Sequence, residues 1–145
     1  MEILSKNLRE TEAAAQVFLE KLAPRQGGAT IVALAGDLGS GKTTFVQSVA
    51  KILGVKEHVA SPTFVLIKTY QLTNFKTYKL ITHVDAYRLK NAAELIKLGW
   101  QEVAADPKNL IFIEWPENVA GVIPEDTVKI KFSFVNENTR KIDFI

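Results

Sequence analysis

The sequence contains no cysteine among its 145 residues, which excludes disulfide bonds and cysteine-ligated metal centres. No apolar stretch is long enough to span a membrane, so we expect no membrane partner. The first ten residues mix charged and apolar side chains and lack the hydrophobic segment of a secretion signal. These absences predict a cytoplasmic protein. A hydrophobic content of 47% and a length of 145 residues favour one globular domain over residues 1–145.

Arginine is also scarce. Only four of the 18 basic residues are arginines, and the formal net charge is just +2, with the two signs interspersed. A nucleic-acid surface usually shows clustered basic residues, and arginine is the side chain best suited to gripping phosphates. We therefore expect no DNA binding, and no strong contact between tRNA and this chain alone.

The sequence does contain one highly specific motif. The run Gly36-Asp37-Leu38-Gly39-Ser40-Gly41-Lys42-Thr43 fits the P-loop pattern G-x-x-x-x-G-K-[ST] at every fixed position. The apolar stretch 31–35 precedes it and is typical of a strand. The stretch 44–53 follows it with apolar residues at helical spacing. Strand, glycine-rich loop and helix are the context that this motif requires.

Each part of the motif has a chemical reason. Glycines let the backbone approach phosphate oxygens, and successive N–H groups with a helix N-terminus form an anion-binding concavity. Lys42 supplies a cation to the β- and γ-phosphates, and the Thr43 hydroxyl is the expected Mg²⁺ ligand. We predict that the bound nucleotide contacts Asp37, Leu38, Gly39, Ser40, Gly41, Lys42, Thr43 and Thr44.

A P-loop needs an acidic residue to complete the magnesium site, and two strands offer one. Residues 110–114 form the purer apolar run and end at Glu114, whereas the more mixed run 80–85 ends at Asp85. Ligands in open α/β sheets collect at the carboxyl ends of strands, so both acids could reach the phosphates. One carboxylate suffices for Mg²⁺. The other would hold a metal-bound water or orient the attacking water, and the pattern leaves their roles open.

Four further residues carry weaker signals. Thr63, in the run Ser61-Pro62-Thr63-Phe64, is either a sensor of the γ-phosphate or part of a proline-bearing loop. His83 is either a packed, hydrogen-bonded structural residue or an acid–base or phosphate contact. Arg88 is either an internal arginine finger or a salt-bridge partner near the helix at Ala92. Trp115, which follows Glu114 directly, belongs to the core or to a lid over the site.

The remaining pattern predicts an α/β fold, a single-domain P-loop NTPase with a mixed, mostly parallel central sheet flanked by helices. We expect the sheet to be parallel around the P-loop and antiparallel toward its edges, with strands 65–70 and 79–85 paired as a hairpin. The predicted helices are 7–22, 42–53 and 92–98, and the predicted strands are 31–35, 65–70, 79–85, 109–114, 128–135 and 141–145.

Together these motifs closely resemble the TsaE (YjeE) family. The resemblance rests on the P-loop run through Thr44, Ser61-Pro62-Thr63-Phe64, His83-Val84-Asp85-Ala86-Tyr87-Arg88, Glu94-Leu95 with Gly99, and Ile113-Glu114-Trp115-Pro116, in the family's order and spacing. It implies a small bacterial ATPase that uses ATP and Mg²⁺. The family acts with the TsaB and TsaD proteins to make threonylcarbamoyladenosine next to the anticodon of tRNAs that read ANN codons.

The resemblance also implies roles for individual residues. Lys42 and Thr43 would be the phosphate-binding lysine and the Mg²⁺ ligand, and Glu114 the acid on the Mg²⁺ side. Asp85 would be catalytic or linked to a switch, and Thr63 would lie in the switch-like loop. Thr11 matches a position near the nucleotide base. The implied nucleotide contacts beyond the P-loop are Thr11, Thr63 and Trp115, and the implied catalytic residues are Lys42, Asp85 and Glu114.

Three classes of protein share the P-loop motif and differ in their other sequence features. The resemblance implies an ATPase subunit that hydrolyses ATP slowly by itself and faster with its partners. Hydrolysis would reset a TsaB–TsaD complex, and that complex would bring in the tRNA. A P-loop kinase would share the first half of the site, but it usually adds a substrate domain and an arginine-bearing lid, for which this chain has no room. A GTPase commonly carries an Asn-Lys-x-Asp loop, and this chain has no such tetrapeptide.

Overall fold

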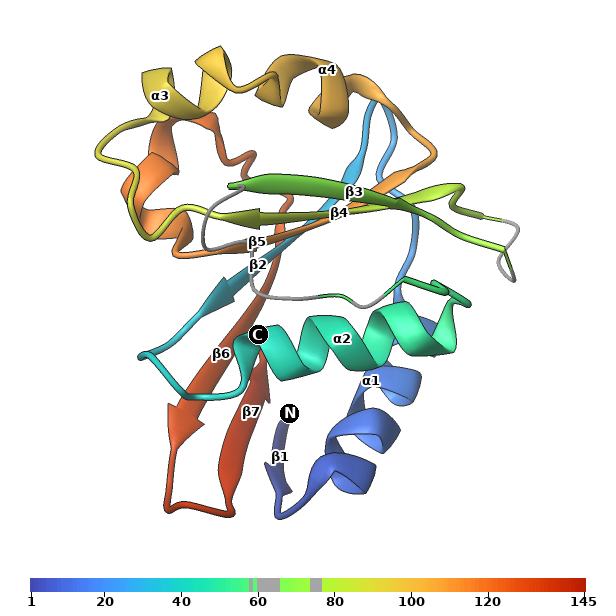
Figure 1. Ribbon diagram of the computed structural model, residues 1–145, viewed down its shortest axis with the longest axis vertical. Coiled ribbons are helices and arrows are strands. Elements are labelled where there is room, and N and C mark those ends of the chain that lie inside the picture. Colours follow the sequence, from blue (N-terminus) through green and yellow to red (C-terminus); the bar gives the residue numbers. More distant parts are fainter. Residues whose placement is uncertain (58, 60–65, 74–76) are drawn as a thin grey trace.

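A seven-stranded sheet organises the part of the chain that the computed structural model describes, residues 1–57, 59, 66–73 and 77–145 (Figure 1). Its spatial order is β1-β7-β6-β2-β5-β4-β3. The strands are β1 (Glu2–Ser5), β2 (Thr30–Ala35), β3 (Ile67–Gln71), β4 (Leu80–Asp85), β5 (Asn109–Glu114), β6 (Val128–Phe134) and β7 (Arg140–Phe144). The helices are α1 (Leu8–Lys21), α2 (Lys42–Ile52), α3 (Ala92–Lys97), α4 (Trp100–Ala105) and the 3₁₀ helix η1 (Pro116–Val122).

The centre of the sheet is parallel and its two sides are antiparallel. Strand β2 lies between β5 and β6, parallel to both, and β4 continues the parallel part beyond β5. Strands β3, β7 and β1 add antiparallel pairs at the two sides. All six residues of β5 and the first five of β2 are buried, as expected for strands covered on both faces. The predicted mixed α/β sheet and the β3–β4 hairpin are confirmed.

Helices cover both faces of the sheet (Figure 1), and the sheet separates two hydrophobic clusters. Because side chains alternate along a strand, Val32 and Leu34 of β2 pack in one cluster, whereas Ile31 and Ala33 pack in the other. The first cluster contains the buried faces of α1 and α2, and the second contains residues of α3, α4 and η1.

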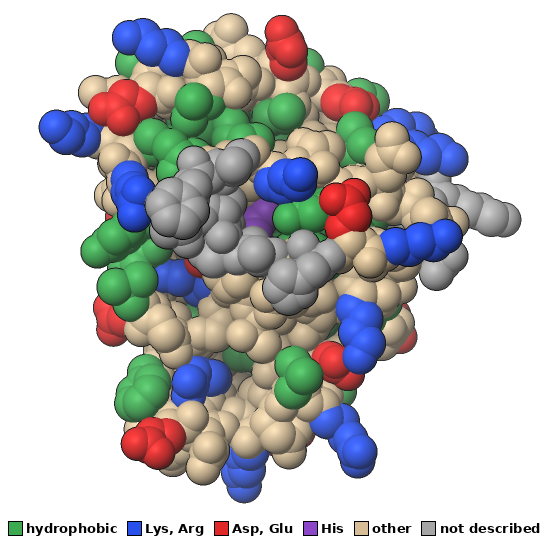
Figure 2. All heavy atoms as spheres, viewed as in Figure 1, with side chains coloured by type: hydrophobic (Ala, Val, Ile, Leu, Met, Phe, Trp, Pro, Cys, Tyr) green, Lys and Arg blue, Asp and Glu red, His purple; other side chains and the backbone are tan. Residues whose placement is uncertain are grey.

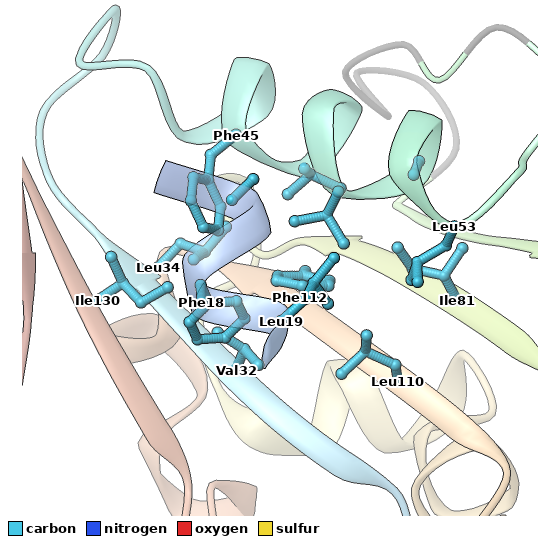
Figure 3. Close-up of a cluster of buried hydrophobic side chains, with 14 of the residues drawn as sticks. Phe18, Leu19, Val32, Leu34, Phe45, Leu53, Ile81, Leu110, Phe112 and Ile130 are labelled. Carbon is cyan, nitrogen blue, oxygen red and sulfur yellow. The ribbon is translucent and has the colours of Figure 1, made fainter. Parts of the chain in front are cut away.

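Aromatic packing seats the start of α2 on the sheet. Phe45 lies one turn into α2 and is fully buried, with its ring centroid 5.7 Å from that of Phe18 of α1 (Figure 3). Its ring centroid also lies 5.6 Å from that of Phe132 of β6. Both pairs meet edge to face, an arrangement that adds to the hydrophobic stabilisation. The N-terminus of α2, where the glycine-rich loop ends, is thereby fixed against β6 and α1.

Three elements were not predicted from the sequence. Strand β1 exists because Glu2 to Ser5 pair with Asp143 to Arg140 of β7, a partner at the opposite end of the chain. The predicted helix 92–98 is confirmed as α3, and α4 is an additional helix that begins after Gly99, whose backbone has φ +96°. The helix η1 follows Trp115 directly. Of the predicted strand 65–70, Val65 lies outside the described residues.

The surface bears both signs of charge. Lysine, arginine, aspartate and glutamate side chains are interspersed over the face that Figure 2 presents. Among the described residues, none of the helices combines the length and the apolar character that a membrane crossing requires.

Candidate functional site

The glycine-rich loop between β2 and α2 lies where three parallel strands end. The register places Leu34 of β2 opposite Glu114 of β5, and Glu114 opposite Asp85 of β4. The last residues of these neighbouring strands therefore share one edge of the sheet with the loop. A cleft with a volume of about 860 Å³ opens at this edge.

Most of the predicted site residues line this cleft. They are Thr11, Leu38, Gly39, Ser40, Gly41, Lys42, Thr43, Thr44, Asp85, Glu114 and Trp115. Asp37 belongs to the same loop but is exposed, and its carbonyl oxygen accepts a 3.2 Å hydrogen bond from the Ser40 N–H. Thr63 and its neighbours 61, 62 and 64 lie outside the described residues. Arg88 is exposed and lines the cleft.

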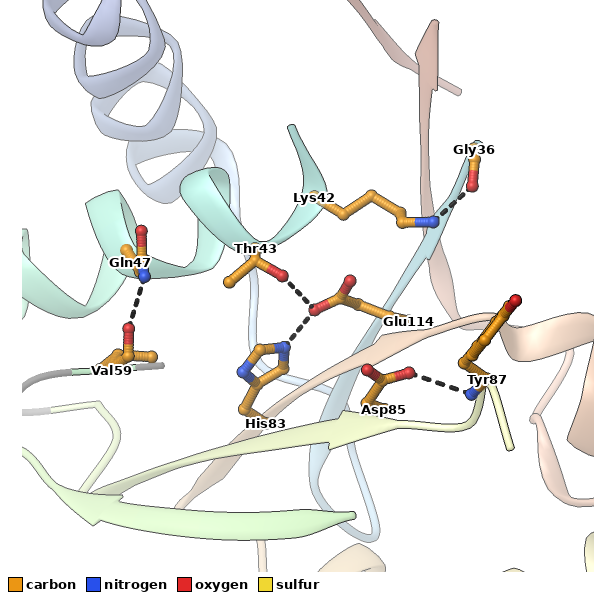
Figure 4. A network of polar contacts seen from close by, with 9 residues as sticks. All are labelled: Gly36, Lys42, Thr43, Gln47, Val59, His83, Asp85, Tyr87 and Glu114. Atoms are coloured by element: carbon orange, nitrogen blue, oxygen red, sulfur yellow. Dashed lines mark hydrogen bonds and ion pairs between the residues drawn. The ribbon is translucent and has the colours of Figure 1, made fainter. Parts of the chain in front are cut away.

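Glu114 contacts side chains from both the start of α2 and the neighbouring strand β4. The Thr43 hydroxyl donates a hydrogen bond of 2.9 Å to Glu114 Oε2, and His83 Nε2 lies 2.5 Å from the same oxygen (Figure 4). His83 and Glu114 are both buried. The interpretation of His83 as a hydrogen-bonded, packed residue is confirmed, and its partner is the predicted magnesium-side acid.

Lys42 is buried at the first position of α2, and its ammonium group bonds back to the Gly36 carbonyl oxygen (Figure 4). The same nitrogen lies 3.8 Å from the centre of the Trp115 ring, a cation–π contact. Burial lowers the pKa of Lys42, and the carboxylates of Glu114 and other nearby acids partly offset this effect. A phosphate oxygen placed beside this partly desolvated ammonium would gain a charge-assisted contact.

Asp85 lies beside Glu114 at the end of β4, but its carboxylate turns to the following backbone. Asp85 Oδ1 accepts a 3.0 Å hydrogen bond from the Tyr87 N–H (Figure 4). Burial raises the pKa of Asp85, and the Tyr87 hydrogen bond partly opposes this rise. A carboxylate whose pKa is raised is a better proton acceptor at neutral pH than an ordinary one.

Trp115 combines the two predicted alternatives, because it packs against the core and also lines the cleft. Its backbone has φ +59°, the one positive value for a non-glycine among the described residues. Such backbone strain is a feature that clusters at functional sites. The Tyr87 ring centroid lies 5.0 Å from that of Trp115, on whose ring the Lys42 ammonium rests.

Two walls of the cleft come from the ends of the chain, and of their residues only Thr11 had been predicted to lie at the site. The turn between β1 and α1 forms one wall, where the buried Ser5 and Thr11 hydroxyls lie 2.6 Å apart. The β6–β7 hairpin forms the other, where the Arg140 stem packs against Gly41 and its guanidinium donates to the Asn136 carbonyl oxygen at 2.7 Å. Apart from the resemblance that pointed to Thr11, no local motif marks either wall.

The site has groups that suit a phosphate and a divalent ion. Ser40 Oγ is buried and has no hydrogen-bond partner within the described residues, so a ligand oxygen could satisfy it. The Thr43 hydroxyl and the Glu114 carboxylate are hard oxygen ligands that lie side by side. Mg²⁺ commonly takes few protein ligands and completes its shell with water and substrate phosphates. The residues present therefore fit magnesium together with a polyphosphate.

The fold and the cleft define an α/β protein in which a glycine-rich loop and the acidic ends of neighbouring parallel strands share one site. A family model described as "Threonylcarbamoyl adenosine biosynthesis protein TsaE" matches residues 5–142. The chain belongs to the TsaE family.

Individual relatives agree with this assignment. The chain is 35% identical over 144 residues to the tRNA threonylcarbamoyladenosine biosynthesis protein TsaE of Rickettsia felis, covering 99% of this chain and 78% of the relative. It is 38% identical over 96 residues to the protein of the same name from Borreliella burgdorferi, covering 66% of each. The crystal structure of Bacillus subtilis YdiB superimposes with a TM-score of 0.75 at 26% identity, covering 99% of this chain and 83% of YdiB.

Proposed function

We propose that this protein is a P-loop ATPase required for threonylcarbamoyladenosine modification of tRNA, acting with TsaB and TsaD. One observation carries the proposal. In a chain of the TsaE family, the Thr43 hydroxyl and the Glu114 carboxylate meet at 2.9 Å beside the Lys42 ammonium, at the mouth of the glycine-rich loop. These are the three groups that a Mg²⁺–nucleotide site of this class requires.

The binding role of each residue follows from its position. The loop N–H groups and the N-terminus of α2 would donate hydrogen bonds to the phosphate oxygens, and so would the otherwise unpaired Ser40 hydroxyl. The Lys42 ammonium would exchange the Gly36 carbonyl oxygen for phosphate oxygens. Thr43 and Glu114 would hold Mg²⁺, which neutralises phosphate charge when it is bound.

The hydrolytic role falls to Asp85. Its carboxylate lies at the same sheet edge as Glu114 and lines the cleft, and burial raises its pKa. We propose that Asp85 orients the attacking water and accepts its proton. Because its carboxylate bonds to Tyr87 N–H in this conformation, hydrolysis by the isolated protein would be slow. Docking on TsaB and TsaD would complete the site, and the partners would bring in the tRNA.

The test is ATP hydrolysis by the purified protein with Mg²⁺, alone and then with TsaB and TsaD from the same organism. We expect slow release of phosphate that rises when both partners are added. Turnover that the partners leave unchanged would contradict the proposal. Transfer of labelled γ-phosphate to an acceptor other than water would instead indicate a kinase.

Replacing Asp85 with asparagine separates hydrolysis from binding. The asparagine side-chain oxygen can still accept the Tyr87 hydrogen bond, so Asp85→Asn should keep ATP affinity. Phosphate release should fall about 100-fold or more, because the general base is lost. The measurements are calorimetric ATP binding and steady-state phosphate release. Loss of ATP binding with hydrolysis per bound ATP unchanged would mean that the roles of Asp85 and Glu114 are exchanged.

We also expect the stability difference between Asp85→Asn and the parent protein to depend on pH. A raised pKa means that the folded protein holds the Asp85 proton more tightly than the unfolded chain, whose carboxyl group titrates near 3.8. The free energy of unfolding therefore loses this contribution as the pH rises from 3.8 through the raised pKa. We expect Asp85→Asn to be at least as stable as the parent protein at neutral pH, with the relative advantage shrinking in acid. Thermal unfolding of both proteins across this pH range measures the difference in their stability.

A further inference from the structure

His83 is the one buried histidine that the structure describes, and it packs beneath Glu114. Its side chain is 1% exposed and that of Glu114 is 5% exposed. They come from β4 and β5, two neighbouring strands of the parallel part of the sheet. Asp85 is opposite Glu114 in the β4–β5 register, and His83 lies two residues earlier on β4, on the same face as Asp85. The imidazole therefore reaches the glutamate from β4, and His83 itself is not among the residues that line the cleft.

Two hydrogen bonds converge on one carboxylate oxygen. Glu114 Oε2 accepts from the Thr43 hydroxyl at 2.9 Å and lies 2.5 Å from His83 Nε2 (Figure 4). Within the described residues, Glu114 Oε1 takes part in no hydrogen bond, and Glu114 lines the cleft. One oxygen is thus tied to the protein and the other is left for a ligand.

The contact defines which imidazole nitrogen carries the proton. A carboxylate oxygen can only accept, so the proton of the His83–Glu114 bond lies on Nε2. His83 Nδ1 is buried and has no partner within the described residues. Within the described residues, the imidazole therefore bonds only to Glu114, through Nε2. Its role in the site depends on reaching that single oxygen.

Such a contact has a use in a metal site. A glutamate side chain has several rotatable bonds, and a magnesium ligand must meet a strict octahedral geometry. A hydrogen bond from outside the metal shell orients the ligand before the ion arrives, and removal of such partners typically costs 10–100-fold in metal affinity. Thr43 cannot serve this purpose alone, because its hydroxyl is the other proposed Mg²⁺ ligand.

We propose that His83 is a positioning residue that orients Glu114 for the divalent ion. This inference rests on the proposed Mg²⁺–nucleotide site. It assigns His83 no contact with the nucleotide and no proton transfer. Its consequence is specific: loss of the His83–Glu114 bond weakens the gain in nucleotide affinity that Mg²⁺ provides, and leaves metal-free nucleotide affinity unchanged.

The test compares two amide substitutions at position 83. In His83→Gln the side-chain nitrogen reaches close to the place of Nε2, whereas in His83→Asn it reaches only to the place of Nδ1. Both variants keep a polar, hydrogen-bonding group in the same buried position. ADP binding is measured by calorimetry for each, with Mg²⁺ and with a chelator. Glu114→Gln serves as the reference for a lost ligand.

A control on the same strand accounts for general damage to β4. The Thr82 hydroxyl is fully buried on the opposite face of β4 from His83 and bonds to Asn109 at 2.9 Å, outside the cleft lining. Thr82→Val removes a buried polar contact from β4 without touching Glu114. It should leave both the metal-free affinity and the Mg²⁺-dependent gain unchanged.

The expected result is a loss of roughly 10–100-fold in the Mg²⁺-dependent gain for His83→Asn, with His83→Gln within a few-fold of the parent protein. A full Mg²⁺-dependent gain in His83→Asn would overturn the inference, as would an equal loss with and without Mg²⁺. A parent protein that binds no ADP under either condition would overturn the proposed nucleotide site itself. The metal-free measurement therefore distinguishes the two failures.

Discussion

ATP affinity is expected to fall roughly 100-fold when Lys42 is replaced by alanine, a loss of about 3 kcal/mol in binding free energy. The Lys42 ammonium is buried beside the glycine-rich loop, where the described residues offer it a carbonyl oxygen, the Trp115 ring and nearby carboxylates. A polyphosphate placed there would gain a charge-assisted contact in a partly dehydrated setting. Calorimetric titration of ATP with Mg²⁺ measures the effect.

Lys42→Met is the matched control, because it keeps an unbranched stem beneath Trp115 and removes only the charge. We expect it to bind ATP as weakly as Lys42→Ala. Because burial lowers the pKa of Lys42, the folded protein holds the charged form at a cost, so neither variant should unfold at a much lower temperature. Near-normal ATP affinity in Lys42→Met would show that the lysine acts through packing and not through its charge.

Gly36→Ala should be the most destabilising substitution in the loop, by about 3 kcal/mol of unfolding free energy. The Gly36 backbone has φ +143°, a region that side-chain-bearing residues rarely adopt. An added Cβ would also collide with the Phe132 carbonyl oxygen and lie 2.9 Å from Ser40 Oγ. The first obstacle is backbone of the neighbouring strand β6, which cannot move without disturbing the sheet. Urea unfolding measures the effect.

Gly39→Ala separates backbone strain from collision. Gly39 also has a positive φ, +74°, but a Cβ there would meet nothing within 4 Å. We expect Gly39→Ala to cost about 1 kcal/mol, from strain alone. If the two variants lost equal stability, the close approach of the loop to β6 would not contribute, and the tight fit at Gly36 would be contradicted.

The glycine-rich loop could be predicted because its information is local. The motif 36–43, the strand before it and the helix after it are consecutive in the sequence, and β2 and α2 formed where hydrophobic periodicity placed them. The same holds for β5, whose uninterrupted apolar run ends at Glu114. A buried parallel strand and an amphipathic helix each leave a pattern in their own residues. Fold class and the candidate acids followed from such patterns.

The sequence pattern by itself determined that two acids lie at strand ends near the loop, but not how they differ. Only the tertiary structure decided that Glu114 meets the Thr43 hydroxyl, because β5 is the direct neighbour of β2 and β4 is one strand further away. It also decided that His83 contacts Glu114 and that Arg140 packs against Gly41. These contacts join residues 31 to 99 positions apart in the chain. They depend on strand order and register, which arise from burial of the whole sheet and leave no trace in any short segment.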